Sequence, residues 1–484
     1  MYTSERLFLG GDWRTPAGGE RIEVVSPATE QRIGHVPAAG KEDVAAAVSY
    51  AREAFDHGPW PLADVTERVA IVRALADAID SRTAEFADVL CAEQGLPRHS
   101  LPAGQIAKAV GAYRAYAEIA EAEPWVDTRP GTGGRTLSVG RLPVGVVAAI
   151  VPWNAPLFVA AMKLAPALIA GNTVILKPPP ETPLHTTLFA DAVREAGLPP
   201  GVLNILPAGA EAGEQLVRHP GVDKVSFTGS TTVGRQVGAI CGAELKRCTL
   251  ELGGKSAAIV LEDFELSPAG ARQLVAGAMV NAGQVCAAQT RILAPRSRYR
   301  DLVAAVAETA AALPVGDPLD PATVIGPLIS ARQRTRVEGY IASGTREGAS
   351  LVTGGTRPDL ERGFYVRPTV FVDVTAAMTI AREEIFGPVV AILPYDTEDE
   401  AVALANDSDY GLAGAVWTGD VEHGAAVARR VRTGSVSVNS PGALDIRGPF
   451  GGFKQSGFGR EGGPEGLAEY TGYQTILLPA QASS

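Results

Sequence analysis

Three side chains stand out as candidates for a reactive site. Cys286 lies in NAGQVCAAQ, where small or uncharged neighbours leave room for a ligand beside the sulfur. Glu251 lies in TLELGGKS between two leucines, where a carboxylate can have a raised pKa and act as a base. Asn154, in the proline-bounded turn PWNAP, has an amide that can donate to a developing oxyanion. The ordinary alternatives are an inert buried thiol, a solvated Glu at a strand end and an amide that holds a turn.

A glycine-containing turn, FTGSTTVG, is a candidate for binding phosphate. It follows the apolar segment KVSF and opens a predicted helix, and Gly229 and Gly234 allow a tight turn and close approach of the backbone. Free N–H groups at the start of a helix favour a phosphate. The spacing is not GxGxxG, so a plain strand-to-helix turn is the alternative.

Alternating strands and helices are predicted around these residues, which indicates a parallel sheet with helices on both faces. Strands are expected over 144–152, 172–178, 202–208 and 224–230, and helices over 157–170, 185–197, 213–220 and 233–243. A second alternating set begins at 256–263, with helices near 268–280, 299–313 and 330–347 and strands near 370–374 and 389–393. Before them come short N-terminal strands, helices over 43–55 and 68–95, and a turn-rich ribbon over 124–142; the segment 472–479 is expected to be a strand.

Composition excludes several classes of protein. The 484 residues suggest two or three domains at about 150 residues each. A formal charge of −11 argues against a nucleic-acid or anionic-membrane surface. The uncharged stretch between Arg141 and Lys163 is broken by three prolines, so no membrane span is expected.

Cysteine and histidine usage gives no sign of a metal site or a disulfide framework. There are four cysteines without a CxxC pair and six scattered histidines without HExxH. The first residues, MYTSERLFLGGDW, lack the basic start and long apolar core of a signal peptide. A cytoplasmic location with reduced thiols is therefore expected.

Six motifs occur in one order along the chain: PWN, the FTGS turn, ELGGKS, GQVC, EEIFGPV at 383–389 and PFGGFKQSGFGRE at 449–461. This combination resembles the aldehyde dehydrogenase superfamily in its hydrolytic, NAD(P)-dependent form. The resemblance runs from the first strands to the C-terminal strand. It implies an α/β fold with a Rossmann-like parallel-sheet cofactor domain, an α/β catalytic domain and a small β oligomerisation ribbon.

The resemblance also implies roles for individual residues. Cys286 matches the nucleophile, Glu251 the general base, and Asn154 the side chain that forms an oxyanion hole with the backbone N–H of the cysteine. Thiolate addition to an aldehyde gives a tetrahedral thiohemiacetal, hydride leaves to nicotinamide, and water activated by the base hydrolyses the remaining thioester. Lys163 and Glu461 match positions that support the base and its proton exit.

NAD, with NADP possible, is the cofactor that the resemblance implies. The residues matched to its site are Val151, Pro152, Trp153, Lys177, Gly209, Gly213, Phe227, Thr228, Gly229, Ser230, Val233, Leu252, Glu384 and Phe386. The residues matched to the aldehyde tunnel are Ala155, Phe158, Val159, Met162, Val285, Ala287, Leu444 and Phe450.

Two departures from the family pattern bear on specificity. The lysine motif usually has a carboxylate three residues after the lysine, but here KPPPE puts Pro180 at that position and Glu181 one residue later. That carboxylate binds ribose hydroxyls and repels a 2′-phosphate, so its loss weakens strict NAD specificity. The residue after PWN is usually aromatic, but here it is Ala155. This small side chain should widen the tunnel, which favours a bulky or hydrophobic aldehyde.

The implied domain organisation has three parts: a cofactor domain over 1–122 and 143–252, a catalytic domain over 253–462, and an oligomerisation segment over 123–142 and 463–484. The ribbon and the terminal strand are expected to pair across a subunit boundary in a homodimer or homotetramer, because an uncovered strand edge is an aggregation risk. The remaining expected partner is the aldehyde.

Two other functions remain open at this point. A CoA-acylating aldehyde dehydrogenase would need no water-activating carboxylate, so the presence of Glu251 argues against it. A catalytically silent scaffold on the same fold would not need to keep Cys286, Glu251 and Asn154 together.

Overall fold

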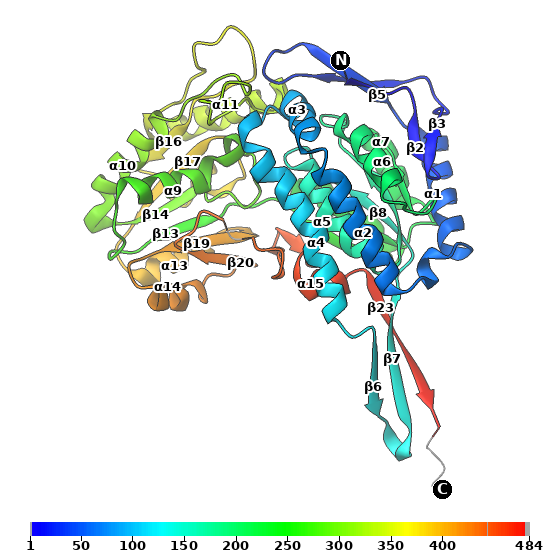
Figure 1. The fold of residues 1–484 in the computed structure, drawn as a ribbon. Helices are drawn as coiled ribbons and strands as arrows, with labels where there is room; N and C mark the ends of the chain where they lie inside the picture. Colours follow the sequence, from blue (N-terminus) through cyan, green and yellow to red (C-terminus); the bar gives the residue numbers. More distant parts are fainter. Residues whose placement is uncertain (1, 443, 480–484) are drawn as a thin grey trace.

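The protein consists of two α/β bodies that lie side by side, with a narrow β-ribbon extending away from them (Figure 1). The computed structural model describes residues 2–442 and 444–479. In this part of the chain, no helix is both long and apolar enough to cross a lipid bilayer.

The first body is built on an eight-stranded sheet with the order β22-β12-β11-β8-β9-β10-β2-β3. Its five central strands run parallel: β8 (Val146–Ile150), β9 (Thr173–Lys177), β10 (Leu203–Ile205), β11 (Lys224–Thr228) and β12 (Arg247–Glu251). Antiparallel strands complete the sheet at its two sides: β2 (Leu7–Leu9), β3 (Asp12–Arg14) and β22 (Gly457–Phe458). The loops after β8, β11 and β12 therefore leave one edge of the sheet together, which is where ligands bind in such sheets.

Strand β22 corrects the predicted catalytic range 253–462. It pairs with β12, with Phe458 opposite Leu250 and Gly457 opposite Glu251, and so belongs to the first sheet. The last part of that range thus lies at the end of β12, beside Glu251. A two-residue strand carries no periodicity that a sequence pattern could reveal.

Helices cover both faces of the first sheet (Figure 1). They are α1 (Lys41–Asp56), α2 (Val65–Asp80), α3 (Thr83–Gln94), α4 (Ala107–Ala122), α5 (Pro156–Ile169), α6 (His185–Glu195), α7 (Ala210–Arg218), α8 (Thr231–Ala243) and α15 (Gly463–Ala468). The single helix predicted over 68–95 is wrong, because the chain leaves helical geometry at Arg82 (φ −105°, ψ 19°) between α2 and α3. The Ser81 hydroxyl donates to the Ala78 carbonyl, a local bond that competes with the helical ladder.

The second body contains a seven-stranded sheet with the order β15-β16-β17-β14-β13-β19-β20. Its strands are β13 (Ala257–Val260), β14 (Arg291–Pro295), β15 (Ser350–Thr353), β16 (Thr369–Val372), β17 (Val389–Tyr395), β19 (Ala413–Trp417) and β20 (Ser435–Val438). The pairing is parallel except between β15 and β16. Its helices are α9 (Pro268–Met279), α10 (Tyr299–Ala311), α11 (Ala331–Arg346), α12 (Thr379–Arg382), α13 (Glu398–Asn406) and α14 (Val421–Ala428).

Two smaller sheets complete the bodies. One contains β1 (Tyr2–Thr3), β4 (Arg21–Val25) and β5 (Arg32–Pro37), and the other pairs β18 (Tyr410–Gly411) with β21 (Phe453–Lys454). Strand β21 therefore ties the segment before β22 to the second body, so that the C-terminal motif spans both bodies.

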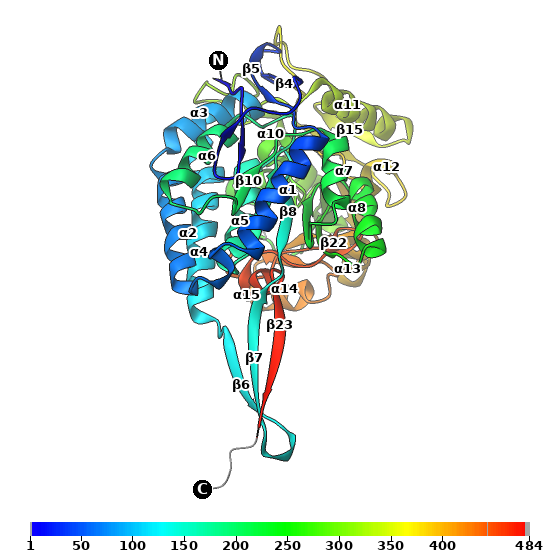
Figure 2. The same cartoon turned by 90° about the vertical axis from the view of Figure 1, so that its right-hand side faces the viewer.

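The projecting ribbon is three-stranded and antiparallel (Figure 2). It contains β6 (Val126–Pro130), β7 (Thr136–Pro143) and β23 (Thr471–Leu478). Strand β23 pairs with β7 along its whole length within one chain, and pairing of this ribbon across a subunit boundary stays a prediction. Asn172 holds the two strands together at their root: its Oδ1 accepts from the Val144 N–H at 2.7 Å, and its Nδ2 donates to the Tyr470 carbonyl at 2.9 Å.

Candidate active site

The loops that follow β8 and the turn Val280–Gly283 bring Asn154 close to the cysteine loop. The Asn154 Nδ2 donates to the Gln284 carbonyl at 2.9 Å, two residues before Cys286. In return, the Asn154 carbonyl accepts from the Asn281 Nδ2 at 2.9 Å. Asn281 and Ala282 have positive φ, which is uncommon for non-glycine residues, and Gly283 after them also has positive φ. These bonds fix the orientation of the Asn154 amide, and its second N–H has no acceptor among the described residues.

Cys286 is half-buried and faces a cavity of about 510 Å³. Burial, together with the nearby carboxyl groups of Glu384 and Glu251, raises the pKa of its thiol to about 12. The backbone N–H groups of Ala287 and Cys286 act in the opposite direction. At neutral pH the thiol therefore keeps its proton, and a nucleophilic role requires a group that accepts it.

Glu251 ends strand β12 and is buried, with 3% of its surface exposed. The ordinary interpretation, a solvated strand-end carboxylate, is therefore wrong. Burial and the like charge of Glu461 raise the pKa of Glu251 well above its usual range, and the cations of Lys163 and Arg460 oppose this. Neither carboxylate oxygen has a hydrogen-bond partner within the described residues. A Cβ at position 451 would lie 2.8 Å from Oε1, so Gly451 makes the room that this carboxylate occupies.

Lys163 and Glu461 form a buried ion pair beside Glu251. The Lys163 side chain is fully buried on α5, and its Nζ lies 2.5 Å from the Glu461 Oε1. A second bond joins the same Nζ to the Ser226 Oγ at 3.2 Å. The three predicted residues thus come together from β12, from α5 and from the segment before α15, three parts of the chain that are far apart in sequence.

Two adjoining cavities contain nearly all of the residues predicted to bind the cofactor. The smaller is the one that Cys286 faces, and the larger has a volume of about 890 Å³. Pro152, Trp153, Thr228, Gly229, Ser230 and Arg332 line both. The larger is also lined by Val151, Lys177, Gly213, Phe227 and Val233, and the smaller by Leu252, Glu384 and Phe386. Gly209 lines neither cavity and lies at the N-terminal cap of α7.

The shape of the glycine turn fits a dinucleotide. The turn after β11 opens α8, where the Ser230 Oγ accepts from the Val233 N–H at 3.4 Å and the remaining N–H groups of the first turn suit a phosphate. A Cβ at Gly229 would lie 2.6 Å from the Phe227 ring, and one at Gly234 would lie 2.3 Å from Leu252. Glycine at these two positions therefore lets the turn and the first turn of α8 pack closely against these side chains.

Glu384 and Trp153 shape the smaller cavity. The Glu384 Oε1 accepts from the Gly254 N–H at 3.1 Å, and burial raises the pKa of this carboxyl to about 7. The Trp153 ring meets the Phe386 ring edge-on at 5.3 Å. A half-buried carboxylate and a hydrophobic wall are suitable partners for a ribose and a nicotinamide, so the residues present fit the implied cofactor.

The sequence analysis did not identify the residues of α11 that line the smaller cavity. The Gln333 Nε2 donates to the Phe386 carbonyl at 2.8 Å, and the Arg336 Nη2 donates to the Glu384 carbonyl at 2.7 Å. Together with Arg332, both residues line the smaller cavity. The sequence ARQRTR looks like any exposed helical surface, so no local signal marks these residues.

The residues predicted to form the aldehyde tunnel line neither cavity. Phe158 and Val159 pack against the core of the first body, Met162 and Phe450 are buried, and Leu444 is 37% exposed. Ala155, Val285 and Ala287 are half-buried. Their assignment to a tunnel stays a prediction.

Comparison with known proteins identifies the family. The model of the aldehyde dehydrogenase family matches residues 13–476. The chain belongs to the aldehyde dehydrogenase family. It is 46% identical to the geranial dehydrogenase of Castellaniella defragrans over 474 residues, which cover 98% of each chain.

Solved structures agree with this assignment. An aldehyde dehydrogenase of Mycobacterium tuberculosis complexed with NAD+ superposes with a TM-score of 0.97 at 51% identity, covering 100% of this chain and 99% of that one. A mutant aldehyde dehydrogenase C of Pseudomonas syringae, in complex with NAD+ and octanal, gives a TM-score of 0.95 at 40% identity and covers 99% and 98%. The predicted α/β fold with a Rossmann-like part and the predicted NAD(P)-dependent oxidation of an aldehyde are confirmed.

Proposed function

We propose that this aldehyde dehydrogenase oxidises its substrate to a free carboxylic acid with NAD+, through an acyl thioester at Cys286. The observation that carries the proposal is the meeting of Cys286, Asn154 and the residues matched to the cofactor at one cavity. The nicotinamide ring of NAD+, when bound, accepts a hydride. Trp153, Glu384 and Phe386 are the residues that would hold it there, and the glycine turn would hold its phosphates.

The first step falls to Cys286 and Asn154. The thiol passes its proton to a water molecule and its sulfur bonds to the aldehyde carbon, while the carbonyl oxygen becomes an oxyanion. The free N–H of the Asn154 amide and the backbone N–H of Cys286 stabilise that oxyanion. Loss of hydride from the carbon re-forms the carbonyl group and leaves the substrate as a thioester.

The second step falls to Glu251. A water molecule loses a proton to this carboxylate and attacks the thioester carbon, and the C–S bond breaks to give the acid and the free cysteine. Burial and the like charge of Glu461 raise the pKa of Glu251, which makes this carboxylate a stronger base than an exposed one. Lys163 and Glu461 lie behind it and would pass the proton onward.

A CoA requirement separates this function from the acyl-transferring alternative. We expect reduced cofactor to accumulate at the same rate with and without CoA, and we expect the product to be the free acid. Absorbance at 340 nm and mass spectrometry of the product measure both quantities. Acyl-CoA formation with a CoA-dependent rate would overturn the proposal, and no aldehyde-dependent reduction at all would favour a silent scaffold.

A hydrophobic aldehyde is the substrate class we favour. One relative is named geranial dehydrogenase, and the structure of another holds octanal. In this chain Ala155 is small where an aromatic side chain is usual. We expect kcat/KM for octanal and geranial to exceed that for acetaldehyde by more than about tenfold, since each buried CH₂ contributes about 0.8 kcal/mol. A preference for acetaldehyde would overturn this assignment.

The predicted division into a cofactor domain (1–122 and 143–252), a catalytic domain (253–462) and an oligomerisation segment (123–142 and 463–484) is retained as a proposal, with β22 reassigned as described. Exposed apolar side chains on the ribbon, among them Val126, Tyr473 and Ile476, support a homodimer or homotetramer. Analytical ultracentrifugation would show a monomer if this were wrong. The four cysteines are free, which suits the cytoplasm, and fractionation of cells would test that location.

A further inference from the structure

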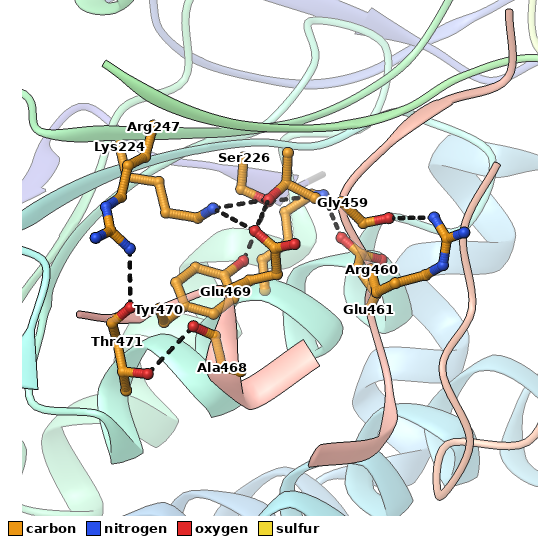
Figure 3. A network of polar contacts seen from close by, with 12 residues as sticks. Lys224, Ser226, Arg247, Gly459, Arg460, Glu461, Ala468, Glu469, Tyr470 and Thr471 are labelled. Carbon is orange, nitrogen blue, oxygen red and sulfur yellow. Dashed lines mark hydrogen bonds and ion pairs between the residues drawn. The ribbon is translucent and has the colours of Figure 1, made fainter. Parts of the chain in front are cut away.

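A buried polar network connects the Lys163–Glu461 ion pair to the root of the ribbon; Figure 3 shows Ser226, Glu461 and Tyr470 within it. Ser226 lies on the central strand β11 and is fully buried. Its Oγ accepts from the Lys163 Nζ at 3.2 Å and from the Tyr470 phenol at 3.1 Å. Tyr470 is also buried, and it immediately precedes β23.

Lys163, Ser226 and Tyr470 hold one another in position through these hydrogen bonds. The Lys163 ammonium group has two acceptors among the described residues, the Glu461 carboxylate and the Ser226 hydroxyl. An ammonium group held by two fixed acceptors cannot swing freely, whereas one held by a single flexible carboxylate can. The Ser226 Oγ in turn is held between its two donors.

The ribbon root sets the place of Tyr470. Its carbonyl accepts from the Asn172 Nδ2, and the Asn172 Oδ1 accepts from the backbone N–H groups of Val144 and Gly145. The next carbonyl, that of Thr471, accepts from the Arg247 Nη1 at 2.8 Å (Figure 3). The position of the Tyr470 phenol is therefore fixed by hydrogen bonds that connect the ends of β7, β12 and β23.

We propose that Ser226 and Tyr470 are positioning residues for the Lys163–Glu461 pair, and that they thereby hold the cation that keeps Glu251 competent as a base. The inference rests on the proposed role of Glu251 in hydrolysis of the thioester. Neither residue touches the substrate or the cofactor cavities; they act through Lys163.

The sign of the effect follows from the charges around Glu251. Groups from several elements face this cluster: Tyr116 on α4, Lys163 on α5, Lys224 on β11, Cys248 and Glu251 on β12, and Arg460, Glu461, Glu469 and Tyr470 around α15. Among them the Lys163 cation lowers the pKa of Glu251, and Glu461 raises it. If Lys163 loses an acceptor and drifts, its attraction weakens and the pKa of Glu251 rises.

Ser226→Ala tests the inference through the pH profile of thioester hydrolysis. We expect the acid limb of the hydrolysis rate to move to higher pH by about 0.5–1 unit, so that the rate below the midpoint falls about three- to tenfold. The initial burst of reduced cofactor keeps its amplitude and rate. Tyr470→Phe, which retains the ring, gives a smaller shift of the same sign, and it adds nothing in a Ser226→Ala background because both act through one oxygen.

Thr249→Val is the matched control. Thr249 lies opposite Ser226 on the neighbouring strand and is equally buried, but its hydroxyl contacts Lys224 and Glu469 and has no bond to Lys163. We expect this variant to move the midpoint by less than Ser226→Ala does, because Glu469, which Thr249 contacts, influences the pKa of Glu251 less than Lys163 does. An unchanged midpoint in folded Ser226→Ala and Tyr470→Phe, or an equal shift in Thr249→Val, would overturn the inference. If Glu251→Gln hydrolysed the thioester at the wild-type rate, the proposed function itself would fail instead.

Discussion

The cluster of Glu251, Lys163 and Glu461 and the groove formed by the two adjoining cavities differ in how their charges are exposed to water. Glu251, Lys163 and Glu461 are enclosed, and burial together with neighbouring charges shifts the pKa of Glu251 strongly. The larger cavity of the groove is lined by glycines and, apart from the buried Lys177, by charges at its rim, such as Arg332, whose side chain is 86% exposed. A charge change in the enclosed site acts at low dielectric and has a large effect, whereas one at the rim is screened by water.

Replacing the sulfur should have the largest effect. We expect Cys286→Ala to reduce aldehyde oxidation by at least about four orders of magnitude, because no other thiol of the described residues lines the cavity and the bond to the carbonyl carbon cannot form. Cofactor binding and the thermal unfolding temperature should change little, since the groove keeps its walls. Steady-state turnover and fluorescence titration with NAD+ measure the two properties. Substantial turnover by the folded variant would refute the assignment.

Removing the charge of the base should divide the reaction into its two steps. We expect Glu251→Gln to slow thioester hydrolysis by about 10²- to 10³-fold while a burst of reduced cofactor remains. Stopped-flow absorbance gives the burst, and intact-protein mass spectrometry after an acid quench detects the acyl adduct on Cys286. A slow steady state without a burst and without the adduct would assign Glu251 to activation of the thiol.

The neighbouring carboxylate should move the pH profile in a known direction. Glu461 raises the pKa of Glu251, so removing its charge lowers that pKa, while the amide oxygen introduced by Glu461→Gln can still accept from Lys163 and keep it in place. Because the base works only when ionised, hydrolysis falls as pH drops through the pKa of Glu251. Glu461→Gln should therefore shift the acid limb to lower pH, by about one unit. This is opposite in sign to Ser226→Ala, so a shift to higher pH would contradict the electrostatic account.

The sequence predicted the alternating strands and helices better than the contacts between segments that are far apart in the chain. The alternation from 144 to 243 correctly predicts the parallel strands β8 to β11, because buried strands and amphipathic helices leave local patterns. Strand β22, the wall supplied by Gln333 and Arg336, and the contact of Tyr470 with Ser226 join segments that are far apart in the chain. Such contacts have no local pattern.

The candidate site shows the same limit. Residue types alone left Cys286 and Glu251 open to ordinary interpretations, and only the order of the six motifs favoured a reactive role. The structure adds the burial of Glu251, which its two flanking leucines only suggest. The roles of these residues stay predictions until the variants are measured.

The smallest effect is expected at the rim of the groove, at Pro180. Pro180 lines the larger cavity with Lys177 and Glu181, and the Glu181 Oε1 lies 3.4 Å from the Arg332 Nη2. Glu181 therefore supplies part of the missing negative charge, and it also opposes the lowering of the Lys177 pKa, which burial brings to about 8. We expect measurable NADP activity in the wild type and a rise of about tenfold in the NAD-to-NADP ratio of kcat/KM for Pro180→Glu, since a carboxylate adds a bond to the ribose and repels a 2′-phosphate.

Pro180→Gln separates charge from shape at this position. It adds a side chain of similar size without the charge, so it should gain little of the discrimination that Pro180→Glu gains. Glu181→Gln should relax the ratio toward NADP, by less than about tenfold because the side chain is partly solvated. High salt should shrink all three differences, as expected for charges at a water-exposed rim and not for the enclosed pair behind Glu251. An undetectable wild-type rate with NADP, or a Pro180→Glu ratio equal to that of Pro180→Gln, would show that charge at this rim does not govern the choice of cofactor.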